Sequence, residues 1–144
     1  NVSSKDTTKV ASNSSSGSPP RLIADLKRLR SSRTPAVNAS RIIGALCKSS
    51  RSEKGRSAIA KAGAIPAIVA AMALHLSDAE VQERGCAALQ NLALEGERRK
   101  MIALAGGTLA VLKAMRSHLE VSAVQERGCG AIRNFVWDND ENRS

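Results

Sequence analysis

Apolar residues recur every three or four positions along most of the chain after residue 20, which is the spacing of one face of an α-helix. Phe135 and Trp137 are the only aromatic residues, whereas sheets concentrate aromatic and β-branched side chains. The expected fold class is therefore all-α. The pattern predicts helices over residues 20–33, 35–50, 52–61, 64–74, 77–94, 97–105, 108–117 and 122–137.

Glycines separate and interrupt these helices. Gly63 and Gly106 follow short helices and permit a sharp turn, because glycine adopts positive φ at little cost. Gly85 and Gly128 lie inside longer helices, where each costs about 1 kcal/mol against alanine. Close approach of a neighbouring helix would explain both. The expected core of the long helices is Val37, Ile42, Ile43, Ala45, Leu46, Val81, Cys86, Ala88, Leu89, Leu92, Val124, Cys129, Ile132 and Phe135.

The hexapeptide VQERGC occurs twice, at Val81–Cys86 and at Val124–Cys129, with starts 43 residues apart. At the same offset, Ile59–Ala93 aligns with Ile102–Val136 without a gap, and 17 of the 35 positions are identical. Self-similarity at this period is typical of helical repeat arrays, which mostly bind other proteins along an extended surface. The repeat predicts a class of function and leaves the partner open.

The offset divides the chain into five parts. Residues 1–19 form a Ser/Thr-rich segment with little to bury, predicted to be a disordered tail. Residues 20–50 are predicted to be a degenerate first repeat, and residues 51–94 and 95–137 two complete repeats of three helices. Residues 138–144 align with the opening helix of the preceding repeat, so we expect the start of a further, truncated repeat there.

Positive charge is concentrated near the N-terminus. Residues 1–58 hold 12 Lys and Arg against 3 Asp and Glu, whereas residues 59–144 hold 10 of each. The basic helix predicted over residues 20–33 has two interpretations: a surface for an acidic partner or an anionic membrane, or the middle helix of the first repeat. The second interpretation accounts for its apolar positions and is preferred.

The three cysteines, Cys47, Cys86 and Cys129, show neither CxxC spacing nor a zinc-type cluster with histidine. We expect buried, reduced thiols, and hence a cytoplasmic or nuclear protein. No catalytic motif, metal site or cofactor motif is present, which predicts a non-enzymatic protein without cofactor. No apolar run approaches the 18 residues of a transmembrane helix.

The two matched copies share the pattern I–x–x–A–G–[AG]–x–x–x–[IV] followed by V–Q–E–x–[AG]–C–x–A–[LI]–x–N–[LF]. This pattern resembles the armadillo repeat over about residues 20–144 and is weakest before Ser52. The resemblance implies a right-handed α-solenoid, or superhelix, of about three three-helix repeats whose third helices line a concave groove.

The resemblance also implies roles for particular residues. In family members that bind extended peptides, an Asn of the third helix bonds to the ligand backbone, a role that carries over to Asn91 and Asn134. Lys48 occupies the same position in the first repeat. Family members that bind basic import signals have a Trp four residues earlier, where this chain has Ala87 and Gly130, so that function does not carry over.

A second ladder of side chains runs beside the first. Arg41, Arg84 and Arg127 occupy one repeat position and stand seven residues, or two helical turns, before Lys48, Asn91 and Asn134. Arginine suits paired recognition of carboxylate or phosphate. The candidate protein-binding residues are therefore Arg41, Lys48, Arg84, Asn91, Arg127, Arg133 and Asn134. The simpler interpretation is local pairing, since Glu80 stands four residues before Arg84.

The leading hypothesis is a protein-binding scaffold or adaptor that holds an extended acidic or phosphorylated segment in a groove. One alternative is association with nucleic acid or an anionic membrane through the basic residues 21–56, which should depend steeply on salt. Another is a regulatory repeat array within a larger multidomain protein.

Overall fold

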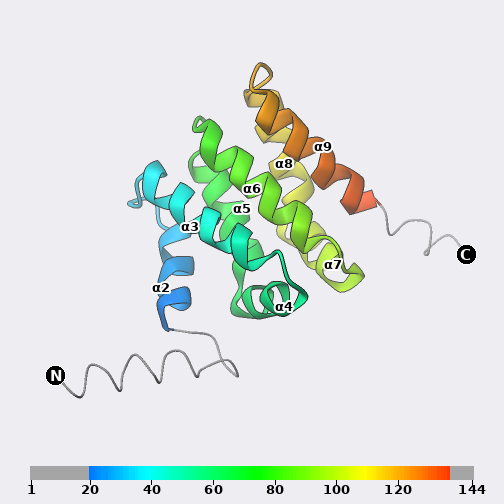
Figure 1. The fold of residues 1–144 in the computed structure, drawn as a ribbon. Coiled ribbons are helices and arrows are strands. Elements are labelled where there is room, and N and C mark those ends of the chain that lie inside the picture. The colour runs from blue at the N-terminus through cyan, green and yellow to red at the C-terminus, as the bar shows by residue number, and fades with distance from the viewer. Residues whose placement is uncertain (1–19, 137–144) are drawn as a thin grey trace, which may run out of the picture.

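The structure is a computed structural model that describes residues 20–136, so the predicted tail (1–19) and further repeat (138–144) lie outside the described residues. Within that range the chain is all-helical (Figure 1). The helices are α2 (Pro20–Leu29), α3 (Ala36–Ser49), α4 (Glu53–Ala62), α5 (Ala64–Leu74), α6 (Ala79–Leu92), α7 (Gly96–Ala105), α8 (Gly107–Ser117) and α9 (Ser122–Val136).

The helices begin and end close to the predicted positions, and the chemistry of single residues explains where. Gly63 and Gly106 end α4 and α7 with φ of 100° and 85°, the left-handed conformation that favours glycine. The Asp78 side chain caps α6 by accepting a hydrogen bond from the backbone N of Val81 at 2.9 Å. The main difference is α2, which ends at Leu29, four residues before the predicted end.

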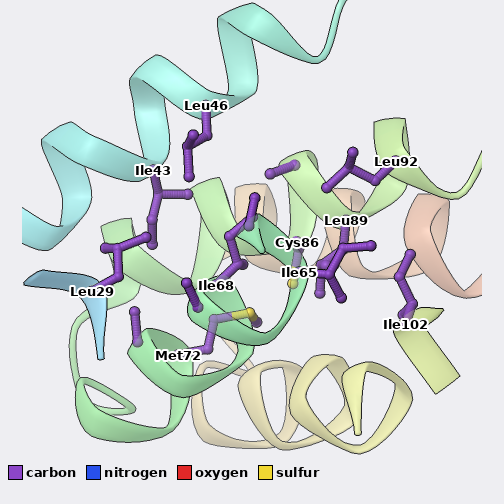
Figure 2. Packing of buried hydrophobic residues seen from close by; sticks show 14 of the residues in the cluster. Leu29, Ile43, Leu46, Ile65, Ile68, Met72, Cys86, Leu89, Leu92 and Ile102 are labelled. Carbon is purple, nitrogen blue, oxygen red and sulfur yellow. The ribbon is translucent and has the colours of Figure 1, made fainter. Parts of the chain in front are cut away.

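Helices α3, α6 and α9 pack side by side in chain order, with α5 and α8 behind α6 and α9 and with α4 and α7 at the lower end of the view (Figure 1). The core forms where α5 and α6 meet their neighbours. Figure 2 shows Ile65, Ile68 and Met72 of α5 packed among side chains of α2, α3, α6 and α7. Helices α4–α9 thus share one apolar core with α2 and α3.

Three residues predicted for the core lie at the surface. Val37 is 67% exposed, and Ala45 and Cys129 are exposed as well. Val37 lies in the first turn of α3, and Ala45 borders an open cleft between α2 and α3. Cys129 lies on α9, which packs on one third helix only, whereas α6 packs on two, α3 and α9. The apolar period therefore gave the correct helix but not the correct face for these positions.

The hexapeptide repeat has a structural role in each copy. The Gln82 side-chain amide donates to the backbone oxygens of Met72 and His75 at 3.1 and 2.8 Å. Gln125 makes the equivalent bonds to the oxygens of Met115 and His118, at 2.8 and 2.9 Å. In each copy, one glutamine bonds to two carbonyls at the end of the preceding helix, where few backbone donors are left. The histidine carbonyl of each pair also accepts from the backbone, His75 from Asp78 and His118 from Val121.

The helix-interior glycines are explained by a close approach, as predicted. A Cβ atom on Gly85 would lie 2.6 Å from Sδ of Met72, and one on Gly128 would lie 2.5 Å from Sδ of Met115. The approaching group is a methionine side chain of the middle helix in the same repeat. The glycines and methionines are repeated together because each pair fills the same space.

Helices α4 and α7 are joined by a cluster of ion pairs. Arg98 donates to Glu53 at 2.8 Å and pairs with Glu95, and Arg56 lies 3.4 Å from Glu95. Both arginine side chains are almost buried. Burial opposes ionisation of Glu95, but the hydrogen bond from Arg98 and the charges of Arg98 and Arg56 outweigh it. The pKa of the Glu95 carboxyl therefore lies below its usual value of 4.5.

This cluster predicts a pH-dependent contribution to stability. A carboxyl whose pKa is lowered by folding stabilises the native state above its unfolded pKa, and the contribution is lost as pH falls through the folded pKa. We expect Glu95→Gln to lower the free energy of unfolding by about 1 kcal/mol at pH 7, because water screens this partly exposed carboxylate. The difference should shrink below about pH 4. Urea unfolding at pH 7 and pH 3, with Glu120→Gln as an exposed control, measures it; a loss that persists at pH 3 would contradict the assignment.

No single helix in the part of the chain that the structure describes is long and apolar enough to cross a membrane; α4 and α5 reach that composition only together and are bent by 73°.

Candidate functional site

All seven predicted binding residues lie on the three helices that pack side by side: Arg41 and Lys48 on α3, Arg84 and Asn91 on α6, and Arg127, Arg133 and Asn134 on α9. We name the surface where these helices meet the α3–α6–α9 face. It comprises Gly44, Cys47, Lys48, Arg84, Ala87, Gln90, Asn91, Arg127, Gly130, Arg133 and Asn134.

Arg84 is committed to contacts within the protein. Its Nη1 donates to the backbone oxygen of Ser40 on α3 at 2.9 Å, and its Nη2 pairs with the Glu80 carboxylate at 2.9 Å. The local pair with Glu80 is therefore present, as the simpler interpretation proposed. Arg84 links α6 to α3, and both terminal nitrogens of its guanidinium are engaged within the protein.

Arg127, at the same repeat position, is exposed and makes neither a hydrogen bond nor an ion pair with any residue in the range 20–136. Two differences in sequence accompany this freedom. Ala123 replaces Glu80 as the residue four positions earlier, and Ala87 replaces Gly44 on the preceding helix. The two arginines thus share a position in the repeat but differ in their surroundings.

The α3 members of the two ladders lie at the edge of the assembly. Arg41 borders a cleft of about 620 Å³ between α2 and α3, together with Arg21, Arg28 and Asp25. Lys48 is exposed. Arg84 reaches back to α3, but no third helix precedes α3 among the described residues, so Arg41 faces this cleft instead.

Both asparagines are half-buried and bond to the preceding third helix. The Asn91 side-chain amide donates to Oγ of Ser50 at 2.9 Å, and Ser50 in turn donates to the oxygen of Cys47 at 2.6 Å. The Asn134 amide donates directly to the oxygen of Gln90 at 2.8 Å. Cys47 and Gln90 are equivalent positions, so both asparagines reach the same carbonyl, one of them through a serine hydroxyl. This interhelix role was not predicted from the sequence.

Two adjoining hollows lie along α9. The first, of about 420 Å³, is lined by Gln90, Glu126, Arg127, Cys129, Gly130 and Arg133. The second, of about 250 Å³, is lined by Ala93, Leu94, Arg99, Arg133 and Asn134. Arg133 borders both and, like Arg127, is exposed without a hydrogen bond or ion pair to the rest of the described chain. The hollows form the most cationic part of the α3–α6–α9 face.

Sequence reasoning missed four residues of the first hollow, Gln90, Glu126, Cys129 and Gly130. The Gln90 side chain packs against α9 at Gly130, where a Cβ atom would lie 2.4 Å from Nε2 of Gln90. Cys129 was assigned to the core, but its thiol is exposed. The signal available in the sequence was the mismatch between copies, because the position of Gln90 holds Cys47 and Arg133 in the neighbouring repeats.

The three thiols have different environments. Burial raises the pKa of the Cys86 thiol to about 12, which makes it inert. Burial also raises the pKa of the Cys47 thiol, although the positive charges of Arg127, Arg51 and Arg84 oppose the shift. Of the three cysteines predicted to be buried, only Cys86 is fully so.

Among residues 20–136, no three His, Cys, Asp or Glu side chains are grouped so that they could hold a metal ion. The chemistry of the face is that of guanidinium, amide and thiol groups. Comparison with protein-family models, with curated proteins and with solved structures gave no match to this chain.

Proposed function

We propose that this chain is a non-enzymatic protein-interaction module that binds an extended acidic or phosphorylated segment along the α3–α6–α9 face. The observation that carries the proposal is the pair Arg127 and Arg133. Both guanidiniums are exposed, have no partner in the described part of the chain, and border adjoining hollows. An exposed guanidinium without a partner in the protein can bind two oxygens of one carboxylate or phosphate group.

The architecture we propose is a solenoid of armadillo-like repeats, with residues 20–50, 51–94 and 95–137 as successive units. Its support is the duplication of contacts at the 43-residue offset: the glutamine bonds to the middle helix, the glycine–methionine contacts and the asparagine bonds to the preceding third helix. A repeated set of contacts is what stacking of equivalent units requires.

The groups around the two arginines favour an extended ligand with several anionic groups. The amide of Gln90 lies beside Arg127 and Arg133 and adds a neutral donor and acceptor. The Glu126 carboxylate lines the same hollow and opposes a single bound anion. A segment that continues from the first hollow into the second would also contact the side of Arg133 that lines the second hollow.

The test is binding of a labelled ten-residue poly-glutamate peptide, and of its phosphoserine counterpart, measured by fluorescence anisotropy at moderate salt. We expect Arg127→Glu/Arg133→Glu to weaken binding by about 100-fold or more, since each charge-assisted contact contributes about tenfold or more. The bound peptide should also slow alkylation of Cys129, which lines the first hollow. Arg84 is not replaced in this test, because its contacts join α6 to α3.

The matched control is Lys113→Glu/Arg116→Glu, which makes the same change of charge on exposed residues of α8. It should change the affinity by less than about threefold, because screening weakens distant charges. Equal losses in both double variants would mean that the peptide senses net charge only, and the proposal would be wrong. Binding of DNA or anionic vesicles that survives the α9 changes but is lost in Arg21→Glu/Arg28→Glu would instead favour the basic region 21–56.

A further inference from the structure

The contrast between Arg84 and Arg127 has a structural cause in the residue beneath each of them. The path of Arg84 from α6 to the Ser40 oxygen crosses Gly44 on α3. A Cβ on Gly44 would lie 3.0 Å from Nη1 of Arg84, 3.4 Å from its Cζ and 3.6 Å from its Cδ. The guanidinium therefore passes closely over Gly44, with Nη1 a few tenths of an ångström nearer than a Cβ atom there would ordinarily allow.

One repeat later this space is filled. Ala87 occupies the position of Gly44, and Glu83 occupies the position of Ser40, whose oxygen holds Arg84. By analogy with Gly44, where a Cβ would lie 3.0 Å from a guanidinium nitrogen, the Ala87 methyl group would crowd an arginine on the same path to the Glu83 oxygen. Arg127 follows no such path, because it is exposed and makes no hydrogen bond within the described residues.

We propose that the residue at this position of each third helix decides whether the arginine of the next repeat is tied to the backbone or offered to a ligand. Ala87 is then a positioning residue that leaves Arg127 available to a ligand. Gly44, in contrast, allows Arg84 to bond to the backbone, which makes Arg84 unavailable. The effect on ligand binding rests on the proposed function, since the unpaired arginine is the one that binds the acidic segment. The structural part stands independently of any ligand.

Two reciprocal substitutions test the inference. Ala87→Gly should let Arg127 bond to the Glu83 oxygen and weaken binding of the poly-glutamate peptide by about fivefold, the effect of a typical net hydrogen bond. Gly44→Ala should displace Arg84 and strengthen binding by a similar factor. Ala103→Gly, on an exposed position of α7, is the control for the helix-propensity cost of glycine and should leave the affinity unchanged.

A second measurement observes the arginines directly. In Ala87→Gly, arginine-selective NMR should show one additional slowly exchanging guanidinium signal, assigned to Arg127 by its loss in Arg127→Lys. In Gly44→Ala, the signal of Arg84 should lose its protection. Unchanged guanidinium signals in both variants would overturn the inference, whatever the peptide does.

The two readouts separate this inference from the proposed function. Shifted NMR signals with no peptide binding by the unmodified protein would keep the role of Ala87 and reject the acidic ligand. Peptide binding that is insensitive to both substitutions, with unshifted NMR signals, would keep the ligand and reject the role of Ala87. Opposite changes of affinity in the two variants, with matching NMR shifts, would support both.

Discussion

Replacement of Gly55 by alanine is expected to lower the free energy of unfolding by about 3 kcal/mol, at the upper end of the usual cost of overpacking. A Cβ atom at this position would lie 1.8 Å from the backbone oxygen of Ser49 and 2.8 Å from its carbonyl carbon. The obstructing atoms belong to the backbone at the end of α3 and cannot rotate away. Helix propensity alone predicts the opposite sign, a gain of about 1 kcal/mol for alanine over glycine within α4. Urea unfolding followed by circular dichroism measures the difference.

Gly44→Ala is the matched control for this prediction. Its Cβ would meet the far end of the flexible Arg84 side chain, at 3.0 Å from Nη1, and not a backbone atom. The loss of the Arg84 bond to Ser40 and the gain in helix propensity are each about 1 kcal/mol, so the net change should be close to zero. A small loss at Gly55, or equal losses at both positions, would contradict the argument from close approach.

The helices and most of their ends could be predicted from the sequence because they depend on local signals. Positive φ at Gly63 and the cap from Asp78 follow from the chemistry of single residues beside an apolar run. The close approach at Gly85 could be predicted because Gly128 repeats it. Gly55 gave no such signal: the equivalent residue one repeat later is Arg98, which pairs with Glu53 and Glu95. The contact depends on the particular turn between α3 and α4.

The candidate site could be predicted only as far as repeat positions. The sequence placed the arginine and asparagine ladders on the third helices, where they lie. The absence of a Glu80 counterpart before Arg127, where Ala123 stands, could be read from the sequence, but the bond of Arg84 to the Ser40 oxygen on the preceding helix could not. Equivalent positions in a repeat share backbone geometry, but their environment depends on the neighbouring layer. The mismatches between copies are therefore more informative about the site than the identities.

Gln82→Ala is expected to lower the free energy of unfolding by about 2–5 kcal/mol. The Gln82 side chain is fully buried and supplies the hydrogen bonds to the carbonyls of Met72 and His75. Truncation would leave the Met72 carbonyl without its side-chain donor and a cavity between α5 and α6, whereas the His75 carbonyl would keep its bond from the backbone N of Asp78 at 2.9 Å. The equivalent substitution Gln125→Ala should cost less, about 1–2 kcal/mol, because the Gln125 side chain is only half-buried and water can reach the exposed carbonyls.

Urea unfolding of the two variants side by side isolates the effect of burial, since the removed atoms and the acceptor positions are the same in both. A larger loss for Gln82→Ala means that the shared hexapeptide stabilises the protein most where layers pack on both sides. Equal losses would show that the bonds act within each repeat regardless of its neighbours. In that case the packing of α6 between α3 and α9 would contribute little beyond the single repeat, and the stacked arrangement would not be the source of stability at this position.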